Sequence, residues 1–333
     1  MRVAAFAGLL LVALGVAAAG AWGAAALAIS GPPALRLALA GAFGAASAAA
    51  LVALVLQRWR WRVLAAYLAL FGAVLVWFFD IEPSNDRDWV PENARLARAT
   101  VEGDFVTVHD VRNFDYRSEF DFTPAYYDRR YDLRQLEGVD LVATYWMGPA
   151  IAHIFLSFAF EGGQHVAVSI ETRKEKGEGY STLNGFFRQY ELYYVVADER
   201  DVIGLRTNYR QDPPEQVYVY RLEGTREGAR RVFLDYVAEV NALKARPEFY
   251  NSLTTNCTTT IWMHSLVNPG HVPFSWKVLA SGYLPQYLYE QGRLDDQGMS
   301  FAELQQAAHV NERAHRIGAT VPDFSRRIRE SPL

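Results

Sequence analysis

The amino-terminal quarter of the chain consists of long apolar runs separated by short polar or turn-forming segments. The runs extend over about residues 3–29, 35–56 and 62–79. At 1.5 Å rise per residue, about 20 apolar residues in a helix cross a hydrocarbon core that is about 30 Å thick. We therefore predict three transmembrane helices within residues 1–80.

Two short connections between these runs predict how the helices are oriented. Residues 30–33 read Ser-Gly-Pro-Pro, and prolines end a helix. Residues 57–62 hold three arginines, and short basic loops stay in the cytoplasm. This places the amino terminus in the cytoplasm and the chain after the third helix on the other side of the membrane. A cleaved signal peptide at 3–29 is the alternative, and it leaves two helices as anchors.

After a linker at residues 81–91, the pattern changes to that of one globular domain over residues 92–333. The clearest signal is 151–172, where two apolar, β-rich stretches flank Glu-Gly-Gly-Gln and predict a β-hairpin. Residues 116–131 are crowded with Tyr, Phe, Asp and Arg and are expected to be irregular. Four further strands are predicted from β-rich composition, at residues 106–111, 140–147, 191–197 and 216–221.

The apolar period becomes helical after residue 224. Apolar positions from Val232 to Leu243 mark one face of a helix that Thr225 caps. A second helix is predicted to begin near Cys257, and Ser300-Phe-Ala-Glu303 is a capping-box pattern for a late helix. Strands followed by helices predict an α+β domain, an antiparallel sheet of about five strands with packed helices.

Charge and cysteine content narrow the range of functions. Residues 81–333 carry 28 basic and 36 acidic residues. This acidic balance argues against a nucleic-acid partner, because affinity for phosphate backbones comes from Lys and Arg. Cys257 is the single cysteine of the chain, so it has no intrachain disulfide partner. In an oxidising compartment a lone thiol needs another explanation.

Cys257 lies in a run of hydroxyl and amide residues, 251–261, immediately before an apolar, helix-like stretch. With one of residues 254–256 as the N-cap, the cysteine sits in the first helical turn. The helix dipole and free backbone amides there favour a thiolate, and the region from Asn256 to Thr258 is suited to support an oxyanion. Cys257 is therefore a candidate nucleophile, with a buried core thiol as the alternative.

A nucleophilic cysteine needs a base, and the chain has seven histidines. His264 is excluded because it lies about 10 Å farther along the same predicted helix. His153 is the first candidate, in an apolar strand where a hydrogen-bonded core histidine is the alternative. His165, beside the hairpin turn, is expected to be solvated. Glu171 is the candidate third group, and strand register decides whether it faces His153.

A metal site is an alternative interpretation of the same residues. Cys257, His153 and either His165 or Glu171 are chemically suited to bind zinc, but no short spacing of ligand pairs supports that interpretation. We therefore predict no metal and no cofactor.

Three arginines are candidates for orienting a substrate. A guanidinium binds a lipid phosphate or a carboxylate through two parallel hydrogen bonds. Solvated turns are the simpler interpretation of the charged runs 173–178 and 198–201. The three are Arg173, Arg206 and Arg210.

Four ordered segments carry a resemblance to a known family. They read AHIFLSFAF, VAVSIETRKEKGEGYS, YELYYVVADERDVIGLRTN and PEFYNSLTTNCTTTI. In this order they resemble the amino-terminal periplasmic domain of the lipoprotein N-acyltransferase Lnb, over about residues 88–270. In that family the membrane part follows the domain, whereas the apolar runs here precede it.

The resemblance implies a thiol enzyme whose Cys and His fall on Cys257 and His153, with Glu171 as the third member. It also implies a bacterial inner-membrane protein with a periplasmic domain, a lipid bilayer as partner, a phospholipid acyl donor and a lipoprotein acceptor. The order His, polar residue, Cys at a helix start also resembles circularly permuted papain-like folds, which is an analogy of fold alone.

Three functions of different classes remain open from the sequence. The first is a membrane-anchored thiol acyltransferase, the second a periplasmic cysteine peptidase or amidase, and the third a non-catalytic binding module. Acyl transfer from a labelled phospholipid indicates the first and release of peptide fragments the second. An unchanged function in Cys257→Ala indicates the third.

Overall fold

The chain divides into two compact units, and each is described by itself. A computed structural model describes residues 2–56 and 59–330. The first unit contains the residues up to Ser84 together with Tyr180–Tyr190, and the second contains Asn85–Gly179 and the residues from Glu191 onward.

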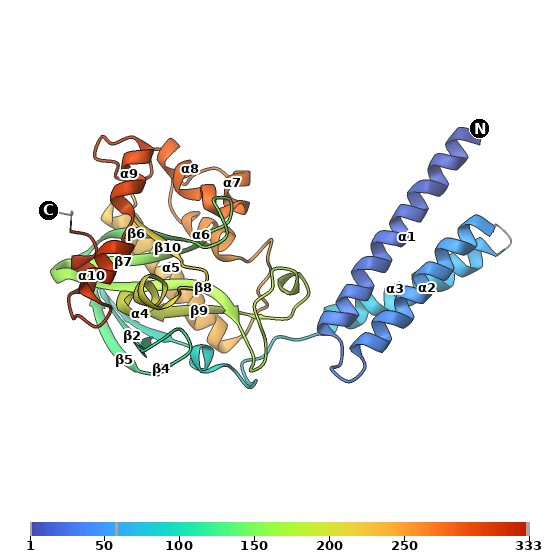
Figure 1. The fold of residues 1–333 in the computed structure, drawn as a ribbon, viewed down its shortest axis with the longest axis horizontal. Coiled ribbons are helices and arrows are strands. Elements are labelled where there is room, and N and C mark those ends of the chain that lie inside the picture. Colours follow the sequence, from blue (N-terminus) through green and yellow to red (C-terminus); the bar gives the residue numbers. More distant parts are fainter. Residues whose placement is uncertain (1, 57–58, 331–333) are drawn as a thin grey trace. The chain divides into compact units, whose positions relative to one another are not determined.

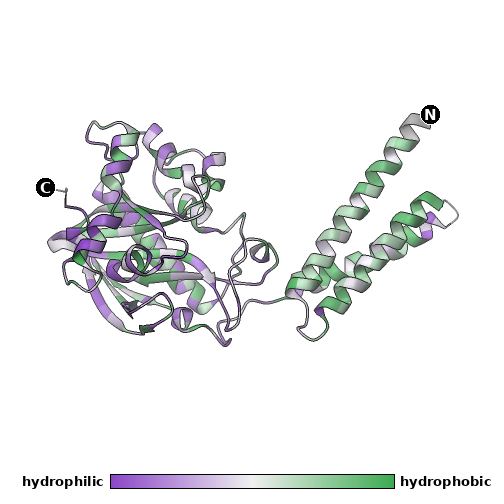
Figure 2. Ribbon diagram, in the orientation of Figure 1, coloured by the Kyte–Doolittle hydropathy of each residue, from purple (hydrophilic) through white to green (hydrophobic). Residues whose placement is uncertain are grey.

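Three long helices form most of the first unit. They are α1 (Arg2–Ser30), α2 (Arg36–Leu56) and α3 (Arg60–Asp80). By length and composition all three are able to cross a membrane, and Figure 2 shows hydrophobic residues along each of them. This confirms the prediction of three membrane-length helices. Of the predicted basic loop at 57–62, residues 57 and 58 lie outside the described part of the chain.

Close approach and polar contacts hold the three helices together. At Gly23 a Cβ atom would lie only 2.5 Å from the ring of Phe43, so glycine lets α2 approach α1. The hydroxyl of Tyr67 on α3 donates to the carbonyl of Val16 on α1, at 3.2 Å. These contacts join all three helices into one bundle.

The segment Tyr180–Tyr190 follows the eighth strand in sequence but packs within the first unit. Phe187 lies against Phe78 and Ala26 in one buried apolar cluster. Arg188 donates from Nη1 to the carbonyl of Ile81, at 2.9 Å. The apolar surface of the bundle is therefore completed by residues far along the chain.

A mostly antiparallel sheet forms the centre of the second unit (Figure 1). Among the described residues it has eight strands, in the order β1-β2-β9-β8-β7-β6-β10 with β5 paired to β2. Only β2 and β9 run parallel. The strands are β1 (Arg98–Glu102), β2 (Phe105–Arg112), β5 (Tyr126–Asp132), β6 (Leu136–Tyr145), β7 (His153–Phe160), β8 (Gln164–Arg173), β9 (Glu191–Ala197) and β10 (Gln216–Arg221).

Helices cover both faces of this sheet. Strands that are buried on both faces read as continuous apolar runs, and β9 and most of β7 do so. The α+β fold class is therefore confirmed. The helices are α4 (Glu199–Gly204), the short π-helix η5 (Leu205–Tyr209), α5 (Arg226–Ala245), α6 (Cys257–Ser265), α7 (Trp276–Leu279), the 3₁₀ turn η6 (Ser281–Tyr283), α8 (Leu284–Glu290), α9 (Phe301–Ala308), α10 (Asn311–Ile317) and α11 (Phe324–Arg327).

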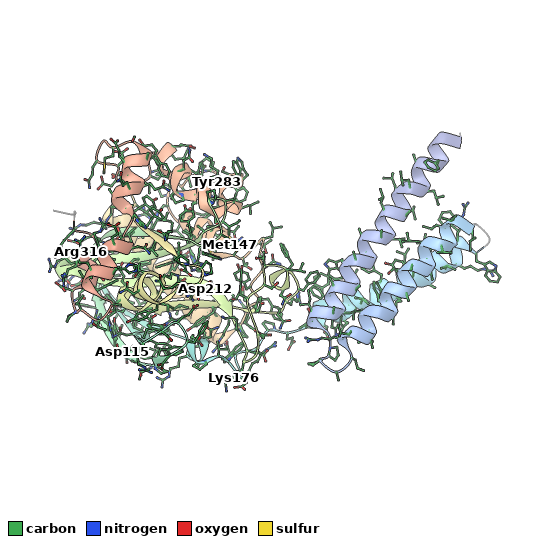
Figure 3. All side chains as sticks on the ribbon, in the orientation of Figure 1. Asp115, Met147, Lys176, Asp212, Tyr283 and Arg316 are labelled. Carbon is green, nitrogen blue, oxygen red and sulfur yellow. The ribbon has the colours of Figure 1, made fainter. Side chains whose placement is uncertain are left out.

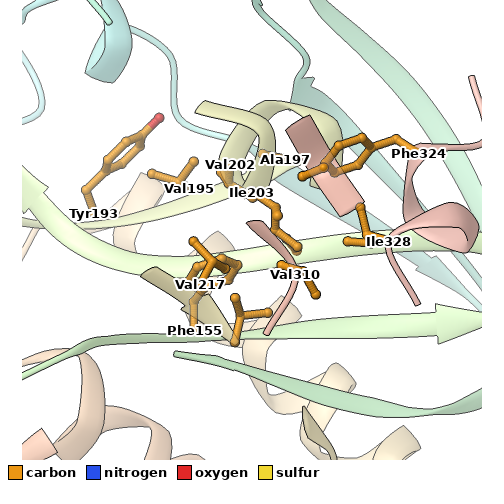
Figure 4. Close-up of a cluster of buried hydrophobic side chains, with 13 residues drawn as sticks. Phe155, Tyr193, Val195, Ala197, Val202, Ile203, Val217, Val310, Phe324 and Ile328 are labelled. Carbon is orange, nitrogen blue, oxygen red and sulfur yellow. The ribbon is translucent and has the colours of Figure 1, made fainter. Parts of the chain in front are cut away.

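One face of the sheet packs against α4, α10 and α11. Figure 4 shows the buried cluster there, in which Phe155 and Val217 from the sheet meet Ile203, Val310 and Phe324. Fully burying side chains of this size stabilises the fold by about 1.5–3 kcal/mol each. This core fixes the strands on which the polar residues described below lie.

The opposite face packs against α5 and α6. The ring of Phe233 on α5 lies 4.9 Å from that of Phe158 and 5.7 Å from that of Phe160. The side chain of Thr225 accepts from the amide of Gly228, so the predicted N-cap of this helix is confirmed. The predicted capping box of Ser300 with Glu303 is present at the start of α9.

Two expectations about the sheet were wrong. Residues 116–131 are not irregular throughout, since they contain β5 and part of a two-stranded ribbon of β3 (Asp115–Tyr116) and β4 (Phe122–Thr123). Tyr131 of β5 points into the core, 4.9 Å from Phe160, while charged neighbours face outward. Strand β1 was not predicted from the sequence, because it is mostly exposed and has no alternation of apolar and polar residues. The sheet is therefore wider than expected.

Candidate functional site

Cys257 is the first residue of α6. Asn256 is the N-cap, and its Oδ1 accepts from the backbone amides of Thr258 and Thr259, at 3.0 and 2.9 Å. The hydroxyl of Thr259 accepts in return from the Asn256 amide, which completes a capping box. This local polar pattern is what sets the helix start directly at the cysteine, which is a free, half-buried thiol.

The sulfur lies where two neighbouring strands separate. Pairing between β7 and β8 ends at Leu156 and Val168, although β7 continues along β6 to His153 and β8 continues along β9 to Arg173. Helix α6 lies against both strands. The backbone amide of Ile154, freed from the ladder, hydrogen-bonds to the sulfur of Cys257. The separation therefore creates the space and one donor for the thiol.

His153 lies between the thiol and a second pair of polar groups. Its Nε2 is 2.7 Å from the Ser169 hydroxyl and 3.6 Å from Oε1 of Glu171. The Ser169 hydroxyl donates to that same Oε1, at 2.8 Å. Because Nε2 faces these groups, Nδ1 is left for the hydrogen bond between His153 and Cys257.

Strand register brings these groups together. Ser169 and Glu171 are two residues apart on β8 and therefore share one face of the sheet. The register pairs Leu156 with Val168, so continuing it puts Glu171 opposite His153. The sequence left two registers open, and this is the one in which Glu171 faces the imidazole. Ser169 was missed, although its spacing from Glu171 was a usable signal.

The environment favours a thiolate and an imidazolium in this pair. Burial raises the pKa of Cys257, but the hydrogen bond and charge of His153 and the amides of Ile154 and Thr258 outweigh it, so the pKa is lowered. Burial lowers the pKa of His153, yet its contacts with Cys257 and Glu171 raise it overall. A thiolate is the nucleophilic form of cysteine, so this geometry activates Cys257.

Glu171 is kept ionised by a buried arginine. Its pKa would rise on burial, but the contacts with His153 and Arg206 hold it well below the usual range. Nη2 of Arg206 lies 3.0 Å from Oε1 of Glu171, and Nη1 donates to the carbonyl of Val202, at 2.9 Å. Arg206 therefore fixes the carboxylate that faces the imidazole.

The other two candidate arginines have protein partners of different kinds. Arg210 pairs with Glu215 at 2.9 Å and with Glu119 at 3.2 Å. It therefore belongs to the same charged network as Arg206. Arg173 lies elsewhere, with its guanidinium 4.1 Å from the centre of the Trp89 ring and with Nε donating to the carbonyl of Asn93, at 3.0 Å. Of the three, Arg206 is the one in contact with Glu171.

The side chains of Asn256 and Thr258 serve the helix cap. Nδ2 of Asn256 donates to the carbonyl of Ser252, at 2.9 Å, while its Oδ1 is used by the cap. The hydroxyl of Thr258 bonds Asn256 Oδ1 at 3.0 Å and the carbonyl of Val278 at 2.6 Å. Both side chains are therefore engaged within the protein, and their predicted support of an oxyanion stays a prediction.

The residue before His153, Ala152, is held in place by Ser281. The hydroxyl of Ser281 accepts from the amide of Ala152 at 2.9 Å and donates to its carbonyl at 2.6 Å. At Gly282 a Cβ atom would lie 2.1 Å from the carbonyl oxygen of Pro149, so this approach requires glycine. The turn η6 therefore holds the start of β7 in place.

His165 is buried at the other end of the hairpin, so the expectation of a solvated side chain was wrong. It lies with Asp140 and Glu199, and one potential metal-ligand atom of each lies within 4.8 Å of the others. Arg329 bridges the two carboxylates, with Nη2 2.7 Å from Oδ2 of Asp140 and 2.5 Å from Oε1 of Glu199. His165 is thus not brought to Cys257.

His264 makes its own contacts. Its Nε2 lies 2.7 Å from the Tyr194 hydroxyl, and its Nδ1 lies 2.7 Å from Oδ2 of Asp235. The ring stacks on Tyr236 with centroids 3.9 Å apart. Both ring nitrogens are therefore engaged, in agreement with the exclusion of His264 as the base for Cys257.

Together these features define an α+β domain with a cysteine and a histidine paired at a helix start, on a chain with three membrane-length helices. Residues 122–282 match the profile of the Lnb N-terminal periplasmic domain. The resemblance predicted from the sequence is therefore confirmed over this segment. Three membrane-length helices followed by such a segment fit a membrane protein with a periplasmic carboxyl-terminal part. No curated protein and no solved structure matches the chain.

Proposed function

We propose that this protein is a membrane-anchored thiol acyltransferase in which Cys257 is the nucleophile and His153 the acid and base. The observation that carries the proposal is the position of His153, held by Ser169 and Glu171 on one side and interacting with Cys257, whose thiol pKa is lowered by that interaction, on the other. Positioned nucleophile and base groups of this kind are the mark of covalent acyl transfer.

In the first half-reaction the Cys257 thiolate attacks an ester carbonyl carbon of a phospholipid. The C–S bond forms, the ester C–O bond breaks, and the His153 imidazolium gives its proton to the departing alcohol oxygen. The backbone amide of Cys257 stabilises the oxyanion that develops on the carbonyl, since the amides of Thr258 and Thr259 are bonded to Asn256. The product is a thioester on Cys257.

In the second half-reaction an amine attacks the thioester. The neutral His153 takes the amine proton, the C–N bond forms and the C–S bond breaks, which restores the thiolate and the imidazolium. The resemblance to the lipoprotein N-acyltransferase Lnb favours the amino terminus of a lipoprotein as this acceptor. Ser169, Glu171 and Arg206 act as positioning residues that hold the imidazole in its orientation.

Exposed apolar side chains in α7 and in the segments that precede His153 and Cys257 favour a lipid substrate over a soluble peptide. Met147, labelled in Figure 3, and Ile151 lie in the loop before His153. Leu253 lies in the segment before Cys257, and Trp276 and Leu279 belong to α7, next to the carbonyl that Thr258 contacts. Exposed apolar side chains of this size are suited to contact with lipid.

The proposal includes an inner-membrane location with the amino terminus in the cytoplasm. The arginine-rich connection before α3 and the periplasmic character of the matched family support this orientation. A phosphatase reporter that is active only in the periplasm should be active when fused after Asp80 and inactive when fused after Arg60. The opposite result would reverse the orientation and contradict the periplasmic site.

The direct test is mass spectrometry of the full-length protein in vesicles of isotope-labelled phospholipid. We expect a labelled acyl adduct on Cys257, which a lipoprotein-derived amino-terminal peptide then removes as an amide. Cys257→Ala should lose both the adduct and the transfer. Transfer that survives in Cys257→Ala, or cleavage of peptides with no acyl adduct, would overturn the proposal.

A further inference from the structure

An apolar cavity of about 310 Å³ opens beside the helix that carries Cys257. It lies between α5, α6, α8 and the neighbouring strands β6 and β7. Ligand cavities of this size and apolar character are typical of small-molecule sites. Its apolar lining includes Leu141, Leu156, Val232, Ile261 and Leu284.

The cavity reaches the first turn of α6, although neither Cys257 nor His153 is among its lining residues. Thr258, the residue after Cys257, is part of its wall, as is Leu156, where the pairing of β7 with β8 ends. From Thr258 the wall follows α6 as far as Ser265, which is roughly 10 Å at 1.5 Å rise per residue. The hydroxyl of Thr258 is hydrogen-bonded to Asn256 Oδ1 and to the carbonyl of Val278. The polar atom that Thr258 brings to the cavity wall therefore already has partners within the protein.

Polarity changes along the cavity. The lining residues Thr258, Leu156 and Ile261 are buried. The charged lining residues Glu223, Arg231 and Arg293 are exposed. Arg231 donates from Nε to Oδ1 of Asn268, at 2.7 Å. The inner part therefore suits hydrocarbon, and the outer part opens to water.

We propose that this cavity holds the hydrocarbon chain of the acyl group carried on Cys257. The inference rests on the proposed acyl-transfer function and adds to it the group that is recognised. The carbonyl of the thioester stays at the start of α6, and the chain extends along α6 past Thr258 and Ile261. Because the cavity has a limited length, it selects acyl groups by chain length.

The test compares phospholipid donors with acyl chains of 8, 12 and 16 carbons, in vesicles that hold the full-length protein. Val232→Trp places a large ring in the cavity from α5. We expect the ratio of 16-carbon to 8-carbon adduct on Cys257 to fall by at least about tenfold, since each methylene lost from an apolar site costs binding. Ala238→Trp, an exposed position on the same helix, is the matched control and should keep the ratio.

The two proposals fail in distinguishable ways. If the unsubstituted protein forms no acyl adduct with any donor, the proposed function is wrong. If adducts form but Val232→Trp leaves the ratio unchanged, the cavity does not hold the chain and the acyl-transfer proposal stands. Should Val232→Trp unfold, Leu222→Phe fills the cavity from the end of β10 and carries the same expectation. The alkylation rate of Cys257 should stay unchanged in both variants.

Discussion

The hairpin of β7 and β8 has a histidine near each end, and the two ends balance their buried charges differently. At the open end His153 lies between the Cys257 sulfur and the Ser169–Glu171 pair, with Arg206 behind. At the turn end His165 lies beside carboxylates that Arg329 bridges. The open end leaves a thiol beside the imidazole, whereas the turn end is closed by an arginine.

The difference shows that a buried carboxylate beside an arginine is not by itself a sign of catalysis. Burial raises the pKa of Glu199, yet Arg329 and its other contacts lower it to about 2. This ion pair therefore stabilises the fold at pH values above the usual pKa of a glutamate. The stabilisation is lost as the pH falls through the lowered pKa of about 2. The thiol distinguishes the open end.

The largest expected effect comes from removing the imidazole at the open end. His153→Gln should slow acyl transfer by about 10²–10⁴-fold, because it removes the proton acceptor and donor. Alkylation of Cys257 by iodoacetamide at pH 7 should slow as well, because the thiol pKa returns toward its usual value. The matched control, His109→Gln on β2, should leave both rates unchanged. Equal rates in both variants would remove His153 from the mechanism.

Next in size is the effect of removing the arginine at the closed end. Arg329→Ala leaves Asp140 and Glu199 buried without their shared partner, which costs about 3–5 kcal/mol of unfolding free energy. The melting temperature should fall by roughly 6–20 °C. Arg326→Ala, three residues earlier in the chain and with exposed partners, should change stability by about 0.5 kcal/mol or less. Similar melting curves for the two variants would show that Arg329 does not stabilise the fold through Asp140 and Glu199.

A smaller effect is expected from the carboxylate behind His153. Glu171→Gln removes the negative charge that favours the imidazolium, so the pKa of His153 should fall and that of Cys257 should rise. The pH profile of Cys257 alkylation should move to higher pH, with a loss of roughly tenfold at pH 7 for a shift of one pKa unit. Glu161→Gln in the hairpin turn should keep the original profile. A profile that does not move would reduce Glu171 to a structural residue.

The smallest effect is expected at Ser169. Ser169→Ala removes the hydroxyl that bridges His153 and Glu171, but the carboxylate remains 3.6 Å from Nε2 and can take its place. A hydrogen bond to a charged group is worth about 1.5–3 kcal/mol. Because the carboxylate recovers part of this, we expect a net loss of about 1 kcal/mol, which slows transfer by roughly fivefold. A loss as large as that of His153→Gln would instead make Ser169 the principal partner of the imidazole.

The parts of the molecule with local signals were predictable from the sequence. The three apolar helices, the hairpin and the capped start of α6 each depend on residues close together in the chain. The face on which Glu171 lies was not predictable, because strand register depends on packing across the sheet. For the same reason the sequence did not reveal the contact of Ser169 with His153, or the burial of His165 against Asp140.

The packing of Tyr180–Tyr190 within the helical unit has a practical consequence for recombinant work. A secreted fragment beginning after Ser84 would lack Phe78 and Ala26, against which Phe187 packs. The aromatic surface of this segment would then be exposed to solvent. Such a fragment is expected to form aggregates during purification, whereas detergent or nanodisc preparations that retain α1 and α3 should remain monodisperse.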